Sequence, residues 1–285
     1  MANLVDFHLH TDVSDGSDTV EGLYHKILQS GVHTFSVTDH DMMEGTLEME
    51  KLTAENPNLT FIRGIEFSCI TPVKKCHILG YNFDPSNEIF QKIYHHGIHL
   101  RQEKTQKRMD FWKNELGLEL TEEEANWLRS QKSPGRPTFG KIILDRGLAP
   151  DMGTAIRQFV SPCKVGNDRI DATDAINAIR SAGGITVWAH PLGGEGEKRL
   201  TTEEFYAQLQ TLIQSGIQGL ECYYSRYTKE EIDFLLNEAN KHHLLVSGGS
   251  DYHGDNKPNL HIGKLCADNM DVNENALTLL NYLFS

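Results

Sequence analysis

The chain opens with Leu4-Val5-Asp6-Phe7-His8-Leu9-His10 and reaches an acid, Asp15, five residues later. Its apolar start predicts a β-strand, in which residues i and i+2 point to the same face. The imidazoles of His8 and His10 would then lie side by side, at a spacing that suits one metal ion. A single His-x-His pair is weak evidence on its own, because the chain holds 14 histidines.

Five further stretches repeat this arrangement, since a short β-branched or apolar run leads into residues of metal-ligand type. They are Thr38-Asp39-His40, Gly64-Ile65-Glu66, Cys76-His77, Ala189-His190-Pro191 and Ser250-Asp251-Tyr252-His253. Each predicts a strand with candidate ligands at its C-terminal end, where α/β barrels carry their active sites. The candidate metal ligands are His8, His10, Asp15, His40, Glu66, His77, His190, Asp251 and His253. The competing interpretation is a set of polar residues that satisfy one another without a metal.

Composition predicts one large folded domain. The 285 residues are 39% hydrophobic, which suffices for a full core, and this length is ordinary for an α/β barrel or for a domain with an insertion. The chain has no apolar run of eighteen residues, and Asp6 and His8 stand where a signal peptide would be basic and then apolar. We therefore expect a cytoplasmic protein that does not bind membranes.

The cysteines are five in number, Cys69, Cys76, Cys163, Cys222 and Cys266, and none forms a Cys-x-x-Cys pair. This pattern argues against a disulfide framework and against a zinc ribbon, so we expect reduced thiols that lie mostly in the core.

Charge is distributed unevenly along the chain. The formal net charge is −13, yet residues 85–165 hold 13 Lys and Arg against 10 Asp and Glu. The remainder holds 14 (27 − 13) against 30 (40 − 10), a net charge of −16. Bound divalent cations would neutralise part of this acidic excess, and the basic segment is suited to an anionic substrate.

Strands and helices alternate over most of the chain, which is typical of an α/β fold. Strands are predicted near residues 4–8, 34–38, 60–65, 77–83, 184–188, 219–223 and 244–247, and helices near 19–30, 44–55, 171–182, 202–214, 228–241 and 273–284. Ser17 or Asp18 is expected to cap the first helix, and Gly31 to end it in a left-handed conformation.

Residues 85–165 break the alternation, because they predict helices and no strand. Thr121 and Glu124 form a capping-box pattern, and Pro137 suits the first turn of another helix. Trp112, Trp127 and Phe139 are expected in the core of this part, although any of them could stack on a base. We therefore predict a barrel domain of residues 1–84 and 166–285 with an inserted helical subdomain, residues 85–165, that selects the substrate.

Several of these stretches together resemble the polymerase and histidinol phosphatase (PHP) superfamily. They are Asp-Phe-His8-Leu-His10, Ser-Asp15-Gly, Thr-Asp39-His40-Asp41, Gly-Ile-Glu66, His77-Ile-Leu-Gly-Tyr, Gly135-Arg136-Pro137, Ala-His190-Pro, Gly-Leu-Glu221 and Gly-Gly-Ser-Asp251-Tyr-His253-Gly. The resemblance runs from end to end in the same order and is closest to the bacterial nucleotide phosphatases and short-RNA 5′ exonucleases. It implies a distorted (β/α)7 barrel with a cluster of two or three divalent metal ions.

The resemblance also implies ligand sets. One metal would be held by His8, His10, Glu66 and Asp251, a second by Asp15, His40 and His253, and a third by Glu66, His77 and His190, with Glu66 bridging. Mixed imidazole and carboxylate ligation suits manganese, zinc or iron, and Asp15, which replaces a His of other branches, weakly favours Mn²⁺. A bridging hydroxide is the expected nucleophile, and Glu66, Asp251 and His253 are the candidate catalytic residues.

The sequence also offers candidate substrate contacts. Arg136, in a Gly/Pro turn before a helix, and Arg226 are the candidate substrate-binding residues, with solvated surface arginines as the alternative. Thr138 and Tyr227 stand where the family pattern often has histidine, and the resemblance implies that these positions are substrate contacts rather than metal ligands. Glu221 would either support a ligand or line the pocket.

We accordingly predict a metal-dependent phosphoesterase that hydrolyses a phosphate monoester of a small metabolite, favouring a nucleoside 3′,5′-bisphosphate or a short oligonucleotide. A phosphatase of a non-nucleotide metabolite, such as histidinol phosphate, and a non-catalytic metal-binding scaffold are the alternatives. No stable protein partner is expected.

Overall fold

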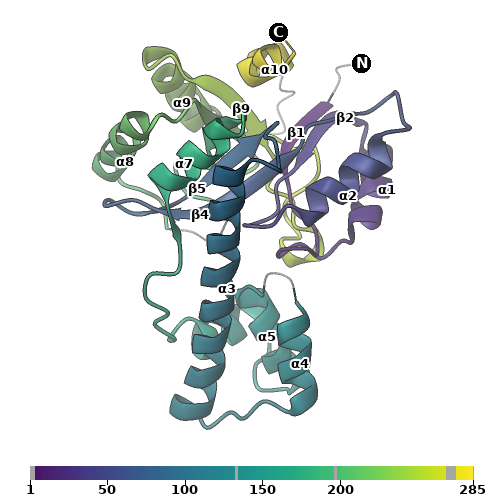
Figure 1. The fold of residues 1–285 in the computed structure, drawn as a ribbon, viewed down its shortest axis with the longest axis vertical. Coiled ribbons are helices and arrows are strands. Elements are labelled where there is room, and N and C mark those ends of the chain that lie inside the picture. Colours follow the sequence, from purple (N-terminus) through teal and green to yellow (C-terminus); the bar gives the residue numbers. More distant parts are fainter. Residues whose placement is uncertain (1–3, 132–133, 196–197, 268–273, 285) are drawn as a thin grey trace.

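Two sheets hold the strands in the computed structural model, which describes residues 4–131, 134–195, 198–267 and 274–284 (Figure 1). The smaller sheet has the order β1 (Leu4–Leu9), β2 (Val32–Val37), β3 (Thr60–Phe61). The larger has the order β6 (Ile170–Asp171), β4 (Gly64–Ile70), β5 (Lys75–Tyr81), β7 (Ile185–Trp188), β8 (Gly219–Tyr224), β9 (Leu245–Gly249). The predicted α/β class is confirmed.

The strands are mostly parallel, but β5 runs antiparallel to both β4 and β7. The two sheets meet through bridges between Leu9 and Tyr252 and between His40 and Glu66. Gly249 allows the first contact, since a Cβ there would lie 2.1 Å from the Cβ of His8. Close backbone approach of this kind is a main use of glycine in strands.

The expected strand over residues 60–65 is wrong in its boundaries. It divides into β3 and β4, because Ile62 donates its backbone N–H to Phe35 while the chain then turns to pair with β5. Glu66 therefore lies within β4, and His77 lies near the start of β5 rather than after a strand. The antiparallel direction of β5 brings its start to the edge where parallel strands end.

Helices cover the sheets on their outer faces (Figure 1). They are α1 (Val20–Ser30), α2 (Glu44–Thr53), α7 (Ala172–Ser181), α8 (Thr202–Ser215), α9 (Lys229–Lys241) and, after a short 3₁₀ turn η3 (Glu274–Ala276), α10 (Thr278–Leu283). Thr19 caps α1, because its side chain accepts from the backbone of Gly22, so the prediction of Ser17 or Asp18 is wrong. Gly31 ends the helix with φ 82°, as expected.

A second group of helices projects from the sheets and is here called the helical segment, residues 88–160. It comprises α3 (Glu88–Glu115), α4 (Glu122–Ser130), α5 (Arg136–Asp145), α6 (Met152–Ala155) and a π-helical turn η1 (Ile156–Val160), and its described part has no strand. In Figure 1 the long α3 runs from the sheets down to α4 and α5. Its first turns contribute Phe90 and Tyr94 to the core of the sheets, whereas Trp112 packs in a separate core with Phe139.

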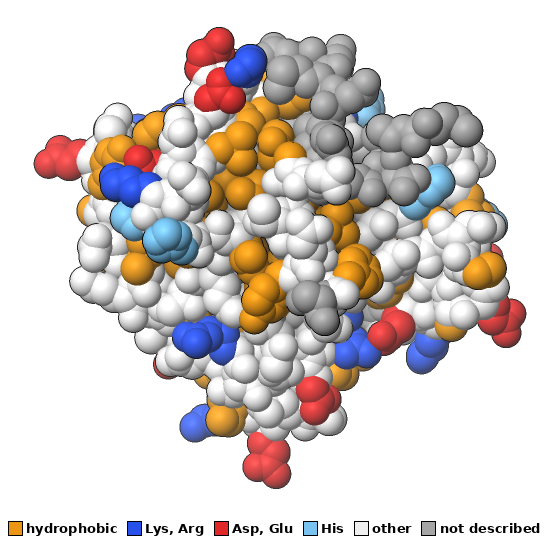
Figure 2. All heavy atoms as spheres, turned by 90° about the horizontal axis from the view of Figure 1, so that it is seen from above, with side chains coloured by type: hydrophobic (Ala, Val, Ile, Leu, Met, Phe, Trp, Pro, Cys, Tyr) orange, Lys and Arg blue, Asp and Glu red, His pale blue; other side chains and the backbone are white. Residues whose placement is uncertain are grey.

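The opposite face of the molecule shows hydrophobic side chains among scattered charges (Figure 2). None of the described helices has both the length and the apolar character that spanning a membrane requires.

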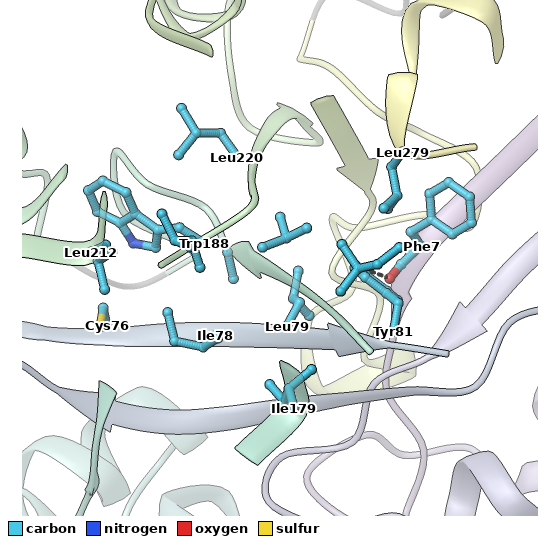
Figure 3. Close-up of a cluster of buried hydrophobic side chains, with 14 of the residues drawn as sticks. Phe7, Cys76, Ile78, Leu79, Tyr81, Ile179, Trp188, Leu212, Leu220 and Leu279 are labelled. Carbon is cyan, nitrogen blue, oxygen red and sulfur yellow. Dashed lines mark hydrogen bonds between the residues drawn. The ribbon is translucent and has the colours of Figure 1, made fainter. Parts of the chain in front are cut away.

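The main core lies around β5 and β7 (Figure 3). Ile78, Leu79 and Trp188 are almost fully buried there, and each such side chain contributes roughly 1.5–3 kcal/mol through removal of apolar surface from water. The hydroxyl of Tyr81 donates to the backbone oxygen of Phe7 at 2.9 Å and so ties β5 to β1. This packing holds His8 and His77 on strands that are fixed relative to one another.

Candidate metal centre

The structure brings all nine predicted ligands together at one edge of the two sheets. They come from β1 and the loop after it, the short segment after β2, from β4 and β5, and from the turns after β7 and β9. Ligand atoms of three subsets lie within 4.8 Å of one another, namely His10, Asp15, His40 and His253; His8, His10 and Glu66; and His40, Glu66 and His77.

The first predicted ligand set converges on one carboxylate oxygen. Glu66 Oε2 lies 3.2 Å from the Nε2 atoms of both His8 and His10. Asp251 Oδ1 lies 3.6 Å from His8 Nε2 and 3.4 Å from His10 Nε2. Two imidazoles and two carboxylates therefore aim at a common point, as the sequence predicted for His8 and His10.

The second predicted set surrounds Asp15, and the third surrounds the other oxygen of Glu66. Asp15 Oδ1 lies 3.2 Å from His253 Nε2, and Asp15 Oδ2 lies 3.7 Å from His40 Nε2. Glu66 Oε1 lies 3.0 Å from His77 Nδ1 and 3.2 Å from His190 Nε2.

Glu66 thus faces two ligand sets with its two oxygens. This is the arrangement a bridging carboxylate requires, since each oxygen then serves a different cation.

The buried polar atoms of this cluster fit a metal centre. The Nε2 atoms of His8, His10 and His253 and the Oε2 atom of Glu66 are buried and have no hydrogen bond of acceptable geometry among the described residues. Buried polar atoms are nearly always hydrogen-bonded, so such a group of exceptions needs an explanation. Cations bound between these nitrogens and oxygens would satisfy them all.

Charge in the cluster also favours cations. Although burial opposes ionisation, His253 and His40 hold the pKa of Asp15 well below its usual range, and His40, His8 and His77 do the same for Glu66. The pKa of Asp251 is likewise low, chiefly through Lys257. The buried Glu66 and Asp251 and the partly exposed Asp15 therefore remain ionised, and divalent cations would balance their charge.

Further contacts hold the ligands in place. For Glu221 the sequence allowed two roles, support of a ligand or lining of the pocket. Its Oε1 atom lies 2.8 Å from His8 Nδ1, and its Oε2 atom accepts the backbone N–H of His190 at 2.6 Å. A carboxylate on the second nitrogen of a ligand histidine fixes the tautomer and orients the ring. The oxygen Asp251 Oδ2 accepts from the hydroxyl of Tyr224 and the Nζ of Lys257, both at 2.9 Å.

Asp39 holds the loop after His10 in place. It accepts hydrogen bonds of 2.6 Å from the hydroxyls of Thr11 and Ser14. Ser14 Oγ in turn lies 3.5 Å from His10 Nδ1.

Two candidate ligands have left-handed backbone conformations, with φ 30° at His190 and φ 56° at Asp251. Such conformations cost free energy in residues other than glycine and tend to cluster at functional sites. At Asp251 the turn lets two residues of the Ser250–His253 stretch, Asp251 and His253, reach the same cluster.

A cavity of about 570 Å³ opens beside the cluster. Asp15, His40, His77, His190 and Asp251 line one side of it, and the helical segment provides another with Arg136, Pro137 and Arg157. Lys257 also lines the cavity. Sequence reasoning missed Arg157 and Lys257, although Lys257 stands only four residues after His253 in the same loop.

The other predicted substrate contacts lie elsewhere. Arg226 is not among the residues that line this cavity; it pairs with Glu195 at 2.8 Å, and its side chain is 44% exposed. Thr138 caps α5 by accepting the N–H of Gly135, and Tyr227 is fully buried with its hydroxyl accepting the N–H of Leu192. Neither position contacts the cavity, which corrects the expectation for both.

Comparison with known proteins identifies the family. A profile for the PHP domain matches residues 6–132, which include the first six of the nine candidate ligands. This N-terminal part of the chain is a PHP domain. The resemblance predicted from the sequence motifs is therefore confirmed.

Relatives of this PHP protein are phosphoester hydrolases. It is 26% identical to a 3′,5′-nucleoside bisphosphate phosphatase of Chromobacterium violaceum, over 89% of this chain and 88% of the relative. It is also 26% identical to the 5′-3′ exoribonuclease Rnm of Escherichia coli, over 88% and 86% of the two chains. A phosphoribosyl 1,2-cyclic phosphate 1,2-diphosphodiesterase of Eggerthella lenta shows the same identity over 87% and 94%.

Solved structures agree with this assignment. A protein from Bifidobacterium adolescentis that was assigned as a metal-dependent phosphoesterase is 26% identical and superposes with a TM-score of 0.77 over 94% of both chains. A Chromobacterium violaceum protein described as an amidohydrolase, at 24% identity and a TM-score of 0.76 over 88% of both chains, shares the fold. The PHP protein described here is a metal-dependent phosphoester hydrolase.

Proposed function

We propose that this enzyme removes a phosphate group from a nucleotide that carries a second phosphate, either a nucleoside 3′,5′-bisphosphate or a short oligonucleotide. The observation that carries the proposal is the position of Arg136. Arg136 begins α5 and lines the same cavity as the candidate metal ligands, but it belongs to the helical segment. A guanidinium at a helix N-terminus binds phosphate through paired donors and the helix dipole.

The proposed catalytic unit is a distorted barrel formed by the two sheets. Support comes from the bridges between the sheets and from the contact of β1 with β9. We assign the nine predicted ligands to two or three divalent ions, with Glu66 bridging. Such ions, when bound, activate a water molecule and neutralise charge on the phosphoryl oxygens.

The protein groups have separate roles in this proposal. His8, His10, Glu66 and Asp251 hold the centre, and Glu221 keeps His8 in the tautomer that leaves Nε2 available. Lys257, 2.9 Å from Asp251 Oδ2, also lines the cavity and would attract the anionic substrate.

The helical segment is proposed to act as the selecting wall. Arg136 and Arg157, which both line the cavity, hold the phosphate that is not cleaved. Arg101, in α3, pairs with Asp41 at 2.6 Å and so fixes the segment to the loop that carries His40.

A phosphate-release screen tests the proposal. The protein would be reconstituted in turn with Mn²⁺, Zn²⁺, Mg²⁺ and Fe²⁺ and assayed on nucleoside bisphosphates, nucleoside monophosphates, short oligonucleotides and histidinol phosphate. We expect substrates with two or more phosphates to be hydrolysed with the highest kcat/KM. A clear preference for a non-nucleotide monophosphate would contradict the proposed substrate. The protein would still be a metal-dependent phosphoester hydrolase.

A further inference from the structure

A second cavity, of about 470 Å³, adjoins the first one on the side away from the metal ligands. The two share Arg136 and Ser161 in their linings, so Arg136 stands between them. The walls of the second cavity come from the turn between β4 and β5, the middle of α3, the residues after η1 and the segment before α8. In Figure 1 the chain that returns from the helical segment to the sheets passes along α3 on the side of the β4–β5 turn.

This cavity is strongly basic, and it is here called the basic pocket. Its lining includes seven cationic side chains and one carboxylate, Asp168, a formal net charge of +6. The cations are Lys74, Lys75, Lys104, Arg108, Arg136, Arg169 and Lys198. The whole chain carries a net charge of −13, so this concentration is not the general character of the surface. On the face that points away from the helical segment, cations and anions are scattered (Figure 2).

Arg108 is the residue that most clearly requires a ligand. It is 7% exposed, and its Nε and Nη1 atoms have no hydrogen-bond partner among the described residues. Its guanidinium lies over the ring of Phe139, 5.5 Å from the ring centroid, which fixes its position in the wall. A buried guanidinium with two unused donors is costly unless an anion approaches it.

The neighbours of Arg108 do not neutralise it. Burial, and to a lesser degree the nearby charge of Arg136, lowers the pKa of Arg108 to about 10. Asp168 is already engaged, at 3.1 Å from Lys75 Nζ and 2.9 Å from Lys104 Nζ. The Nε of Arg169 is also buried and has no hydrogen-bond partner within the part of the chain that the structure describes. The pocket therefore holds more donors than its own carboxylate can satisfy.

We infer that the basic pocket binds phosphate groups of the substrate that lie beyond the one held at Arg136. This inference rests on the proposed function and extends it, because a mononucleotide with two phosphates would be held by the metal centre, Arg136 and Arg157 without the basic pocket. The six cations other than Arg136 suit a chain of several phosphates, and the continuity of the two cavities at Arg136 gives such a chain a path. The substrate class is therefore a phosphodiester chain of at least three phosphates.

Two variants test the basic pocket. Arg108→Met removes the guanidinium but keeps a long apolar stem in the wall, and Lys198→Ala removes an exposed cation whose loss should not affect folding. Lys141→Ala is the matched control, since this exposed lysine of α5 pairs with Asp145 and does not line the pocket. The Mn²⁺-reconstituted enzyme would be assayed on 5′-phosphorylated mono-, di-, tri- and tetranucleotides over a range of salt concentrations.

The expected result is a loss that grows with chain length. For Arg108→Met, KM for the tetranucleotide should rise about ten- to a hundredfold, with kcat nearly unchanged, because the contact is charge-assisted and remote from the reacting phosphate. The dependence of log KM on log salt should become shallower by about 0.7 for each lost contact, the value for single strands. Lys198→Ala should show the same change of slope with a smaller rise in KM.

Equal losses on all chain lengths would overturn the inference, because Arg108 would then act only through folding. A second combination of results would also overturn the inference. In it, inorganic tripolyphosphate inhibits the wild type competitively but not Arg108→Met, and the wild-type KM does not depend on chain length. The basic pocket would then bind a separate anion rather than the substrate. If the wild-type enzyme hydrolyses monophosphate esters best, the proposed function itself fails. That result is distinguishable from the others because it needs no variant.

Discussion

Replacing Glu221 with glutamine would test how strongly the candidate metal centre depends on a residue that does not bind the metal. Glu221 is fully buried, its Oε1 atom lies 2.8 Å from His8 Nδ1, and its Oε2 atom accepts the N–H of His190 at 2.6 Å. When His8 Nε2 binds a cation, Nδ1 carries the proton, so Glu221 faces two donors. Glutamine has the same shape but can accept with only one of its two terminal atoms, so its NH₂ group would face a donor.

The hydrogen bond that Glu221→Gln removes determines how much metal affinity should be lost. A hydrogen bond to a charged group contributes about 1.5–3 kcal/mol, and about 1.4 kcal/mol corresponds to a factor of ten in an equilibrium constant. Loss of one such bond to His8 or to the turn of His190 should therefore weaken metal binding about ten- to a hundredfold. Losses of the same order are typical for groups that support metal ligands. Solvent screening should not reduce this loss of metal affinity, because both carboxylate oxygens of Glu221 are buried.

Isothermal titration of the metal-free protein with Mn²⁺ and Zn²⁺ would measure the effect directly. Glu195→Gln is the control, since Glu195 lies at the same cavity but pairs with the exposed Arg226 and should leave the affinity unchanged. The melting temperature of the metal-free variant should stay near that of the wild type. Unchanged metal affinity in Glu221→Gln, with the fold intact, would refute the reasoning.

The remaining predictions concern the ligands, proton competition, substrate binding and packing. His8→Ala and Asp251→Ala should each lower bound metal by about one equivalent by elemental analysis, since a dication cannot replace the lost ligand without rearrangement; full occupancy in both variants would contradict the ligand assignment. Contacts with Asp251 and Glu66 raise the pKa of His10 to about 9, although burial of the imidazole acts in the opposite direction. The imidazolium proton must therefore leave when metal binds, and the metal affinity should increase with pH up to about 9. Calorimetry at pH 7 in buffers of different ionisation enthalpy should detect its release, and an absence of proton release would count against the site. Arg136→Ala should lower kcat/KM for a nucleoside bisphosphate about ten- to a hundredfold, mainly through a higher KM, whereas kcat/KM for a simple monophosphate ester should fall much less. Equal losses for the two substrates would indicate that Arg136 contacts the scissile phosphate. Gly249→Ala should destabilise the protein by about 1–3 kcal/mol or more in chemical denaturation, because the new Cβ would overlap the Cβ of His8; wild-type stability would show that β9 can move away from β1.

The sequence by itself determined the α/β class, the family and the identity of the ligand candidates. These properties depend on local patterns, such as the period of a strand that places His8 and His10 on one face, or the capping box that opens a helix at Thr121. Local hydrogen bonding and side-chain direction produce such patterns, so they can be recognised without knowledge of distant residues. The same patterns predicted the helices of residues 88–160 and the glycine end of α1.

Only the tertiary structure decided which residues meet. The antiparallel course of β5 placed His77 at the ligand edge, although it lies near the start of a strand, and no periodicity in the sequence reports strand direction. The partners of Glu221 are 213 residues away at His8 and 31 residues away at His190, a pairing that depends on the packing of β1, β7 and β8. The basic pocket likewise joins Arg108 to cations of distant segments, because charge adds up in space rather than along the chain.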